Sequence, residues 1–234
     1  MNNFSPEQKM QTEFISKNHQ RPDSYFGEFF GYMKQSLAAG GSELGLGMTL
    51  FSLAVSTKAT RIIEIGRFKG FSTLCLASAL KFLDIGWQEP KQHQQRPDIN
   101  YDVFENPGAG LLISIDPFPT IEAEDLITKT NLNKYVQFIN KRSDEVDLEG
   151  EYDLIFIDGD HSYDGCKQDT LLYVPWLLRS GGYFILHDYF GWYDTEGQNN
   201  SPIKKITDEI IAEGICEHIL IDTGYMSFTV FRKW

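Results

Sequence analysis

The sequence predicts an α/β fold in which helices cover both faces of a mostly parallel sheet. Short runs of β-branched and apolar residues, such as Ile62–Ile65 and Leu111–Ile115, alternate with stretches that have the apolar spacing of helices. Continuous apolar strands of this kind are typical of parallel sheets buried on both faces. Acidic residues follow several of these runs, and ligands bind such sheets beyond the carboxyl ends of the strands. We therefore expect a ligand site at one edge of the sheet.

Length, charge and cysteine content narrow the class of protein. A chain of 234 residues fits one α/β domain with additions and can bury roughly 70% of its unfolded surface. The formal charge of −12 disfavours nucleic acid as a partner, because that binding depends on Lys and Arg neutralising phosphates. The three cysteines match neither a disulfide framework nor a zinc motif, and no signal peptide or membrane-spanning stretch is predicted. We expect a soluble, cytoplasmic protein without a membrane partner.

Residues 1–41 are predicted to form an N-terminal helical extension. Pro6 and Pro22 are helix start signals, and an aromatic cluster lies in the second helix, at Tyr25, Phe26, Phe29, Phe30 and Tyr32. Such a helix packs on the core or on a second subunit of a homodimer, or it forms a lid over a pocket. Another helix, from Ser42 to about Ser56, begins the main domain at 42–234.

The main domain is organised around the stretch Thr60–Leu80, which is predicted to form a strand, a glycine loop and a helix. Gly66 and Gly70 permit a sharp turn and the close approach of a ligand, and the helix points unpaired N–H groups at the loop. The loop lacks the glycine spacing of a dinucleotide motif and the lysine of a phosphate-binding P-loop. An acid, Glu64, precedes it and two hydroxyls, Ser72–Thr73, follow it. A glycine turn without any ligand is the alternative.

The second predicted strand ends in a carboxylate at Asp116. In nucleotide-binding folds an acid at such a position binds the ribose hydroxyls, usually about 20 residues beyond the glycines. Asp116 lies 116 − 66 = 50 residues beyond Gly66. The excess matches a segment rich in proline and glutamine, 84–110, which is predicted to be a surface insertion. An aspartate that only caps the next helix is the alternative.

Two further strands end beside acidic and histidine side chains. The strand Tyr152–Ile157 precedes Asp158, and a fifth strand, expected to start at Gly181–Gly182, leads to His187 and Asp188. If these strands are neighbours, their ends lie about 5 Å apart, and two carboxylates that close require a shared proton or a cation. Carboxylates with an imidazole suit Mg²⁺ or a similar divalent cation. The predicted metal ligands are therefore Asp158, His187 and Asp188.

His161 lies one helical turn beyond Asp158. A cation held by the carboxylates lowers the pKa of a bound substrate hydroxyl. A neutral imidazole is the side chain best suited to remove that proton near pH 7. His161 is thus the candidate catalytic base, with a purely structural histidine as the alternative.

The string E-I-G-R-F-K-G-F-S-T, residues 64–73, resembles the first motif of class I S-adenosylmethionine-dependent methyltransferases. The strings I-D-G-D-H-S-Y-D-G and G-G-Y-F-I-L-H-D-Y resemble the small-molecule group that includes macrocin-type O-methyltransferases and cephalosporin hydroxylase relatives. This likeness extends from about Gly41 to Trp234. It implies a Rossmann-like fold with a mostly parallel seven-stranded sheet, helices on both faces and a C-terminal antiparallel hairpin. His187 stands where the macrocin type has a glutamate ligand, and Tyr189 where the more distant catechol type has an asparagine.

Carried over position by position, the resemblance also implies the residues that bind S-adenosylmethionine. Glu64 is expected to meet the methionine ammonium group, Asp116 the ribose, and Ser143 with Asp144 the adenine. Asp158 and Asp188 match metal ligands of the family. The full cofactor set comprises Glu64, Gly66, Arg67, Gly70, Phe71, Ser72, Asp116, Ser143, Asp144 and Asp158.

Together, the residues and the resemblance predict methyl transfer from S-adenosylmethionine to a hydroxyl group of a small molecule, such as a natural product, a sugar or a phenol. A divalent cation, with Mg²⁺ expected, assists the reaction. The alternatives are a nitrogen acceptor, a hydroxylase-like relative on the same fold, and a module that binds the cofactor without catalysis. Trp192 and Tyr193 are candidates for the wall of the substrate pocket, with packing as the alternative.

Overall fold

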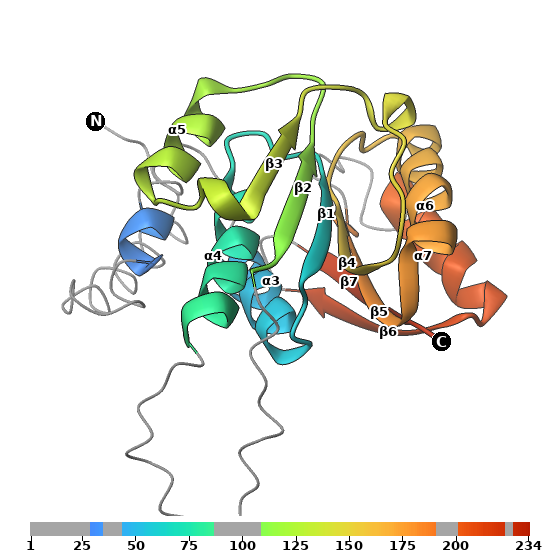
Figure 1. Ribbon diagram of the computed structural model, residues 1–234. Coiled ribbons are helices and arrows are strands. Elements are labelled where there is room, and N and C mark those ends of the chain that lie inside the picture. The colour runs from blue at the N-terminus through green and yellow to red at the C-terminus, as the bar shows by residue number, and fades with distance from the viewer. Residues whose placement is uncertain (1–28, 35–43, 87–108, 191–200, 223–226) are drawn as a thin grey trace, which may run out of the picture.

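A computed structural model describes residues 29–34, 44–86, 109–190, 201–222 and 227–234 (Figure 1). Its strands are β1 (Arg61–Ile65), β2 (Leu111–Ile115), β3 (Val136–Ile139), β4 (Tyr152–Ile157), β5 (Leu178–His187), β6 (Cys216–Asp222) and β7 (Ser227–Lys233). They form one sheet in the order β3-β2-β1-β4-β5-β7-β6. The first five strands run parallel, and β7 lies antiparallel between β5 and β6. The predicted seven-stranded sheet with its C-terminal hairpin is confirmed.

Helices cover both faces of this sheet. They are α3 (Leu44–Ser56), α4 (Phe71–Gly86), α5 (Ile121–Lys129), α6 (Tyr163–Leu177) and α7 (Pro202–Glu213), with single turns η3 (Asn133–Tyr135) and η4 (Ser143–Glu145). Figure 1 shows α3, α4 and α5 on one face and α6 and α7 on the other. In β4, Leu154 and Phe156 pack with the first group, whereas Ile155 and Ile157 pack with the second. This alternation explains why residues 154–157 of the strand are all apolar.

The fifth strand begins earlier than the sequence predicts. β5 starts at Leu178, directly after α6, so the expectation that Gly181–Gly182 starts the strand is wrong. Its pairing with β4 is irregular, because Tyr152 pairs with Leu178 whereas Leu154 pairs with Tyr183. Gly181 has a φ of +73°, which an L side chain rarely adopts, and this accommodates the extra residues. The glycines therefore mark an irregularity inside the strand.

The segment predicted as an insertion, 84–110, begins with helical residues, since α4 continues through Gly86. Asp84 accepts hydrogen bonds from Lys134 Nζ at 2.7 Å and from the Tyr135 hydroxyl at 2.8 Å, which joins the end of α4 to η3. Residues 87–108 lie outside the described residues, as does the predicted pocket wall at Trp192 and Tyr193.

Part of the predicted N-terminal extension, residues 29–34, is described and is helical. Phe29 and Met33 are buried in the core with α3 and α4, and the Phe29 ring stacks on Phe51 with centroids 4.9 Å apart. These contacts support the interpretation that this part packs on the core. The lid and homodimer alternatives stay predictions.

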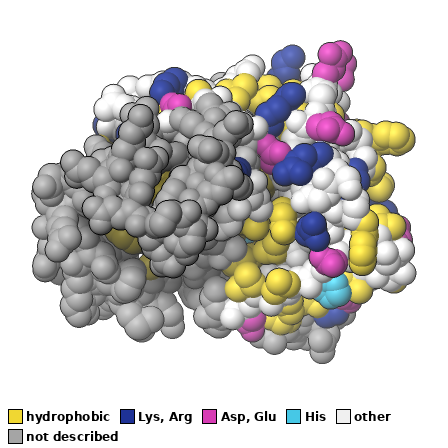
Figure 2. Space-filling view, turned by 60° about the horizontal axis from the view of Figure 1, so that its bottom comes forward, with side chains coloured by type: hydrophobic (Ala, Val, Ile, Leu, Met, Phe, Trp, Pro, Cys, Tyr) yellow, Lys and Arg dark blue, Asp and Glu magenta, His cyan; other side chains and the backbone are white. Residues whose placement is uncertain are grey.

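On the surface seen in Figure 2, Lys and Arg side chains are interspersed with Asp and Glu over the described part of the chain. Among the described helices, none has the length and hydropathy needed to cross a membrane.

Candidate active site

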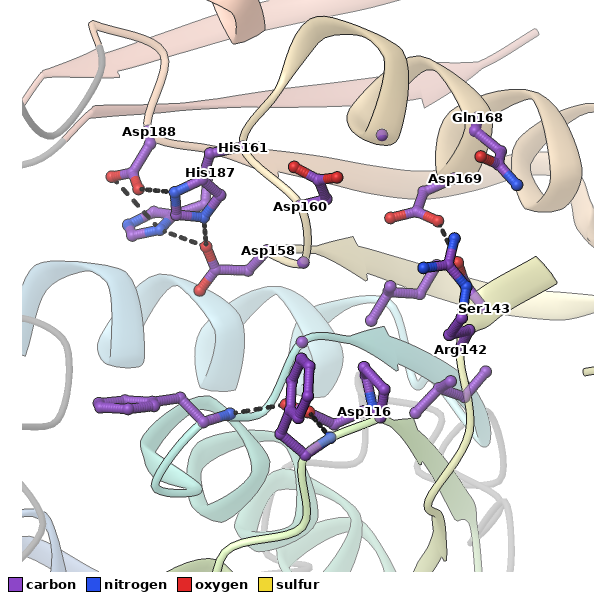
Figure 3. A pocket seen from close by; sticks show the side chains of 18 of the residues that line it. Asp116, Arg142, Ser143, Asp158, Asp160, His161, Gln168, Asp169, His187 and Asp188 are labelled. Carbon is purple, nitrogen blue, oxygen red and sulfur yellow. Dashed lines mark hydrogen bonds and ion pairs between the residues drawn. The ribbon is translucent and has the colours of Figure 1, made fainter. Parts of the chain in front are cut away.

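A cavity of about 770 Å³ opens where the carboxyl ends of β1, β2, β4 and β5 meet (Figure 3). Its wall carries Asp116 on one side, and Asp158, His161, His187 and Asp188 on the other. The parallel strands bring these residues together, because all four strands end at the same edge of the sheet.

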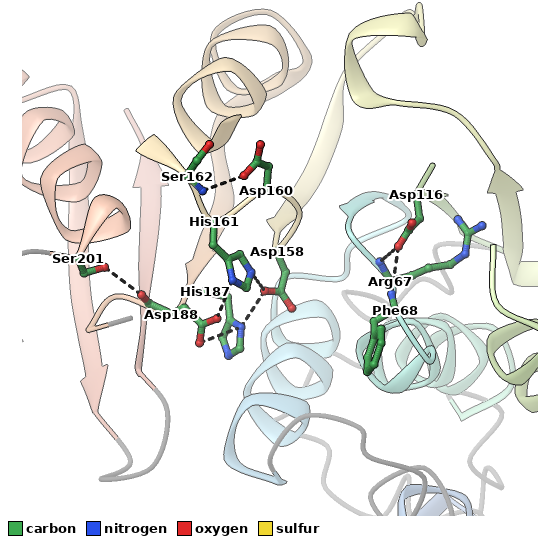
Figure 4. A network of polar contacts seen from close by, with 10 residues as sticks. All are labelled: Arg67, Phe68, Asp116, Asp158, Asp160, His161, Ser162, His187, Asp188 and Ser201. Atoms are coloured by element: carbon green, nitrogen blue, oxygen red, sulfur yellow. Dashed lines mark hydrogen bonds and ion pairs between the residues drawn. The ribbon is translucent and has the colours of Figure 1, made fainter. Parts of the chain in front are cut away.

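The carboxylate of Asp158 lies within hydrogen-bond distance of two imidazoles (Figure 4). Its Oδ1 lies 2.8 Å from His187 Nδ1 and 3.2 Å from His161 Nε2. The other ring nitrogen of His161, Nδ1, lies 3.4 Å from Asp188 Oδ2. The register of β4 with β5 produces this cluster, since Ile157 pairs with Leu186 and the next residue of each strand is Asp158 and His187. His161 lies in the loop that precedes α6 and joins the cluster from there.

His187 and Asp188 are consecutive residues, yet both line the cavity. In an extended strand, neighbouring side chains point to opposite faces. Asp188 escapes this rule because its φ is +56°, in the left-handed region. Its carbonyl oxygen accepts a hydrogen bond from Ser201 Oγ at 3.4 Å. A non-glycine residue in this region costs about 1–3 kcal/mol, and such strain concentrates at functional sites.

The cluster perturbs the acidities of its members. Burial by itself raises the pKa of Asp158, but the charge of His187 and the hydrogen bonds from both imidazoles bring it down to about 2. The hydrogen bond to Asp158 raises the pKa of His161, although burial opposes it. Burial, more than the charge of Asp158, raises the pKa of Asp188. Strong pKa shifts of several groups in one cavity are typical of catalytic sites.

The predicted metal ligands fit a cation. One ligand atom from each of Asp158, His187 and Asp188 lies within 4.8 Å of the other two. His187 and Asp188 are 5% exposed, so a cation held there would be largely shielded from solvent. Two carboxylates facing one imidazole are a donor set that binds divalent cations.

Asp116 is held by the loop after β1. Its Oδ2 accepts hydrogen bonds from the backbone N–H groups of Arg67 at 3.0 Å and Phe68 at 3.1 Å, and its Oδ1 accepts one from Phe118 at 2.8 Å. The carboxylate lines the cavity and is fixed in place. Three of the four lone-pair sites of the carboxylate are therefore used, and Oδ1 keeps one with which it can accept a further hydrogen bond.

Position 66 requires a glycine, because here the loop after β1 passes close to the end of β4. The φ of Gly66 is +82°, and a Cβ at this position would lie 2.1 Å from the carbonyl oxygen of Asp158. Gly66→Ala is expected to lower the free energy of unfolding by roughly 2–5 kcal/mol, from a left-handed backbone and overpacking together. Gly214→Ala is the matched control, since Gly214 has a φ of +65° and open space around it. Urea unfolding of both variants separates the cost of the left-handed backbone from the cost of overpacking. Equal losses in the free energy of unfolding would contradict the packing contribution.

Several residues predicted to bind the cofactor do not line this cavity, namely Glu64, Arg67, Gly70, Phe71, Ser72 and Asp144. Glu64 is fully buried, and its carboxylate accepts hydrogen bonds of 2.6 Å from the hydroxyls of Ser72, Thr73 and Ser114. Burial raises the pKa of Glu64 despite these donors. Its side chain braces β1, β2 and α4 against one another.

The Arg67 side chain turns away from the cavity into the protein. Its guanidinium donates to the carbonyl of Ser114 at 3.1 Å and to Asn140 Oδ1, and it lies 4.9 Å from the centroid of the Phe138 ring. Only its backbone N–H reaches Asp116. Burial lowers the pKa of Arg67.

Ser143, predicted at the adenine, lines the cavity. Its hydroxyl donates to Asp169 Oδ1, and Asp169 is buried in the wall. The carboxylate of Asp144 instead accepts hydrogen bonds from Arg142 Nε at 3.0 Å and Gln168 Nε2 at 3.2 Å. Of the predicted pair, Ser143 therefore faces the cavity, and Asp144 anchors its wall.

Comparison with known proteins places the chain in a family. Residues 63–189, more than half of the chain, match the model of a family described as a methyltransferase domain. The chain belongs to this methyltransferase family. The predicted membership of the class I methyltransferases is thereby confirmed. No curated protein matches the sequence.

Solved structures share the fold of this methyltransferase. The O-methyltransferase from Bacillus cereus in complex with SAH is 18% identical, with a TM-score of 0.62 over 95% of this chain and 100% of that one. TomG from Streptomyces achromogenes, an O-methyltransferase in complex with SAM, is 18% identical with a TM-score of 0.60 over 88% of each chain. SAH-bound PaMTH1 from Podospora anserina is 17% identical, with a TM-score of 0.56 over 99% and 89%.

Some cavity residues of this methyltransferase were not predicted from the sequence. Asp169 lies on α6, on the same buried side as Cys166, Thr170 and Tyr173. An acid at that helical spacing among buried residues is a signal that it faces something other than water. Phe68 and Phe118 line the cavity while 61% and 78% exposed, so they form its rim.

The pH dependence of stability tests the environment of Asp169. Burial raises its pKa to about 6, so between about pH 4 and 6 the folded state binds more protons than the unfolded state. The free energy of unfolding therefore falls as pH rises through this window. Relative to wild type, Asp169→Asn is expected to gain up to about 3 kcal/mol between pH 4 and pH 7. Urea unfolding at both values measures this, and parallel pH dependences would contradict it.

Proposed function

We propose that this methyltransferase transfers a methyl group from S-adenosylmethionine to a hydroxyl group of a small molecule, assisted by a divalent cation. One observation carries the proposal: a single cavity joins the fixed carboxylate of Asp116 to the cluster of Asp158, His161, His187 and Asp188. The first suits a nucleoside and the second suits activation of a hydroxyl. The cavity is large enough for a cofactor and an acceptor side by side.

The nucleoside end is built from the loop after β1 and the tip of β2. Asp116 accepts a ribose hydroxyl with the Oδ1 lone pair that its three backbone donors leave open. Gly66 lets the loop close on β4 beside this position. Ser143, with Asp169 behind it, lies on the same wall as Arg142 and serves as the adenine contact. The structural relatives bound to SAM or SAH support this choice of cofactor.

The acceptor end carries the chemistry. Asp158, His187 and Asp188 would hold the cation, which would supply a positive charge that lowers the pKa of the substrate hydroxyl. His161 is the most exposed member of the cluster, with 44% of its side chain accessible, so it is placed to take the hydroxyl proton. The substrate oxygen then bonds to the methyl carbon as the carbon–sulfur bond breaks, and the thioether leaves. The protein contributes positioning and removal of the proton.

Glu64 and Arg67 support this site from behind. Both are buried and neither lines the cavity, so we assign them to holding the loop after β1 and the tip of β2. In that role Glu64 would affect the cofactor only through the position of the loop.

Incubation with methyl-labelled S-adenosylmethionine and a panel of catechols, sugars and phenols, each with a divalent cation or with a chelator, tests the proposal. Transfer of label to an oxygen, lost in the chelator, is the expected result. Transfer to an oxygen that is insensitive to the chelator would contradict the role of the cation, and cofactor binding without transfer to any acceptor would contradict catalysis. Consumption of oxygen would point to the hydroxylase-like alternative.

A further inference from the structure

The predicted cation ligands are not an all-oxygen set. Asp158 and Asp188 supply carboxylates, but the third ligand, His187, supplies an imidazole nitrogen. Mg²⁺ prefers six oxygen ligands in octahedral geometry and is usually held by one or two carboxylates and water. Imidazole suits zinc, iron and other first-row transition ions. The donor set therefore bears on which cation the site takes.

The nitrogen of His187 points at both carboxylates (Figure 4). Nδ1 lies 2.8 Å from Asp158 Oδ1 and 3.5 Å from Asp188 Oδ1. A cation held by these two oxygens would therefore have an imidazole nitrogen among its ligands. His161 adds a second imidazole, 3.2 Å from Asp158 and 3.4 Å from Asp188, on the exposed side of the cluster.

His187 is not free to withdraw from this position. It is the last residue of β5, its backbone pairs with Phe228 of β7, and its side chain is 5% exposed. Its ring lies 6.2 Å from the centroid of Phe156, which belongs to the core with α3 and α4. Side chains packed in a core keep one arrangement, so water could not replace the imidazole without repacking.

We propose that this site binds a first-row transition ion, such as Zn²⁺, Co²⁺ or Fe²⁺, in preference to Mg²⁺, and that His187 sets this preference. The inference replaces the Mg²⁺ expected from the sequence, and it rests on the cation site of the proposed function. It does not depend on the identity of the acceptor. The residues Asp158 and Asp188 supply affinity for any divalent cation, whereas the imidazole discriminates among them.

Binding of Co²⁺ to metal-free protein tests this directly, because its visible d–d absorption reports ligand type without requiring turnover. The protein is stripped with a chelator, desalted and titrated with Co²⁺, and then Zn²⁺ or Mg²⁺ is added as competitor. We expect a stoichiometric spectrum that equimolar Zn²⁺ removes and that a 1,000-fold excess of Mg²⁺, roughly 4 kcal/mol of selectivity, leaves in place. Displacement of Co²⁺ by Mg²⁺ at comparable concentrations would overturn the proposal.

Two variants isolate the role of His187. His187→Asn is expected to weaken Co²⁺ binding by more than the roughly 10- to 100-fold that loss of an outer partner costs. His187→Asp creates an all-carboxylate set, in which Mg²⁺ should compete at least tenfold better than in wild type. His218→Asn, on the exposed strand β6, is the matched control and should behave as wild type. An unchanged Co²⁺ spectrum and affinity in both His187 variants, with native circular dichroism, would contradict the inference.

The same preparations separate this inference from the proposed function. Label transfer that persists without any bound metal would overturn the cation site and leave methyl transfer standing. A His187-dependent Co²⁺ site in a protein that methylates no acceptor would uphold the inference and count against the proposed reaction.

Discussion

His161→Ala is expected to lower the turnover of methyl transfer by about 10²- to 10⁴-fold, the contribution of a positioned general base. His161 lies between Asp158 and Asp188 on the exposed side of the cluster, and in the proposed mechanism it takes the proton of the substrate hydroxyl. In the described part of the chain, no hydrogen bond or ion pair joins its side chain to Asp116, so the dissociation constant of S-adenosylmethionine should change little. Single-turnover rates and equilibrium binding of the cofactor measure the two effects separately.

The control for this variant is His218→Ala, which removes an imidazole from the exposed strand β6. Added imidazole should restore part of the turnover of His161→Ala, since it can enter the space left by the side chain. Normal turnover in His161→Ala would remove the base from the mechanism. Loss of cofactor binding together with turnover would instead assign His161 a structural role.

Asp116→Ala is expected to weaken S-adenosylmethionine binding by at least about 30-fold. Hydrogen bonds to a charged group contribute about 1.5–3 kcal/mol each, and about 2 kcal/mol corresponds to that factor. The substitution also leaves the N–H groups of Arg67, Phe68 and Phe118 without their acceptor, so the loop loses its anchor. Calorimetric titration of the cofactor measures the loss.

Two further variants provide comparisons for Asp116→Ala: Asp116→Asn as an intermediate case and Asp125→Ala as a control. The amide of Asp116→Asn keeps one acceptor oxygen, so its binding should fall between wild type and Asp116→Ala. Asp125 is an exposed residue of α5 that pairs with Lys129, and its removal should leave binding unchanged. Cofactor affinity in Asp116→Ala equal to that of Asp125→Ala would show that the carboxylate does not touch the ribose.

The sheet could be predicted because its central strands are apolar on both faces. Ile62 and Ile63 face opposite helical layers, and each layer demands an apolar side chain. The start of β5 could not be predicted in the same way. Gly181–Gly182 is a common signal for the end of a helix, and the pairing of Leu178 with Tyr152 depends on a contact distant in sequence.

The cluster of Asp158, His187 and Asp188 was predictable from one rule, that parallel strands end at a common edge. The direction in which a side chain turns at that edge was not. Glu64 and Arg67 stand in the loop motif, yet their side chains form hydrogen bonds with hydroxyls and a carbonyl inside the protein. Ser114, a hydroxyl within an otherwise apolar strand, was the clue that a buried partner exists for Glu64.

The left-handed backbone of Asp188 limits which residues evolution or protein engineering can place there. Asn tolerates this conformation at least as well as Asp, whereas longer or branched side chains do so poorly. Asp188→Asn therefore removes the charge and retains the turn, while Asp188→Glu retains the charge and strains the turn. Asp188→Glu is the most conservative substitution in chemical terms. At this position it nevertheless disturbs the main-chain conformation.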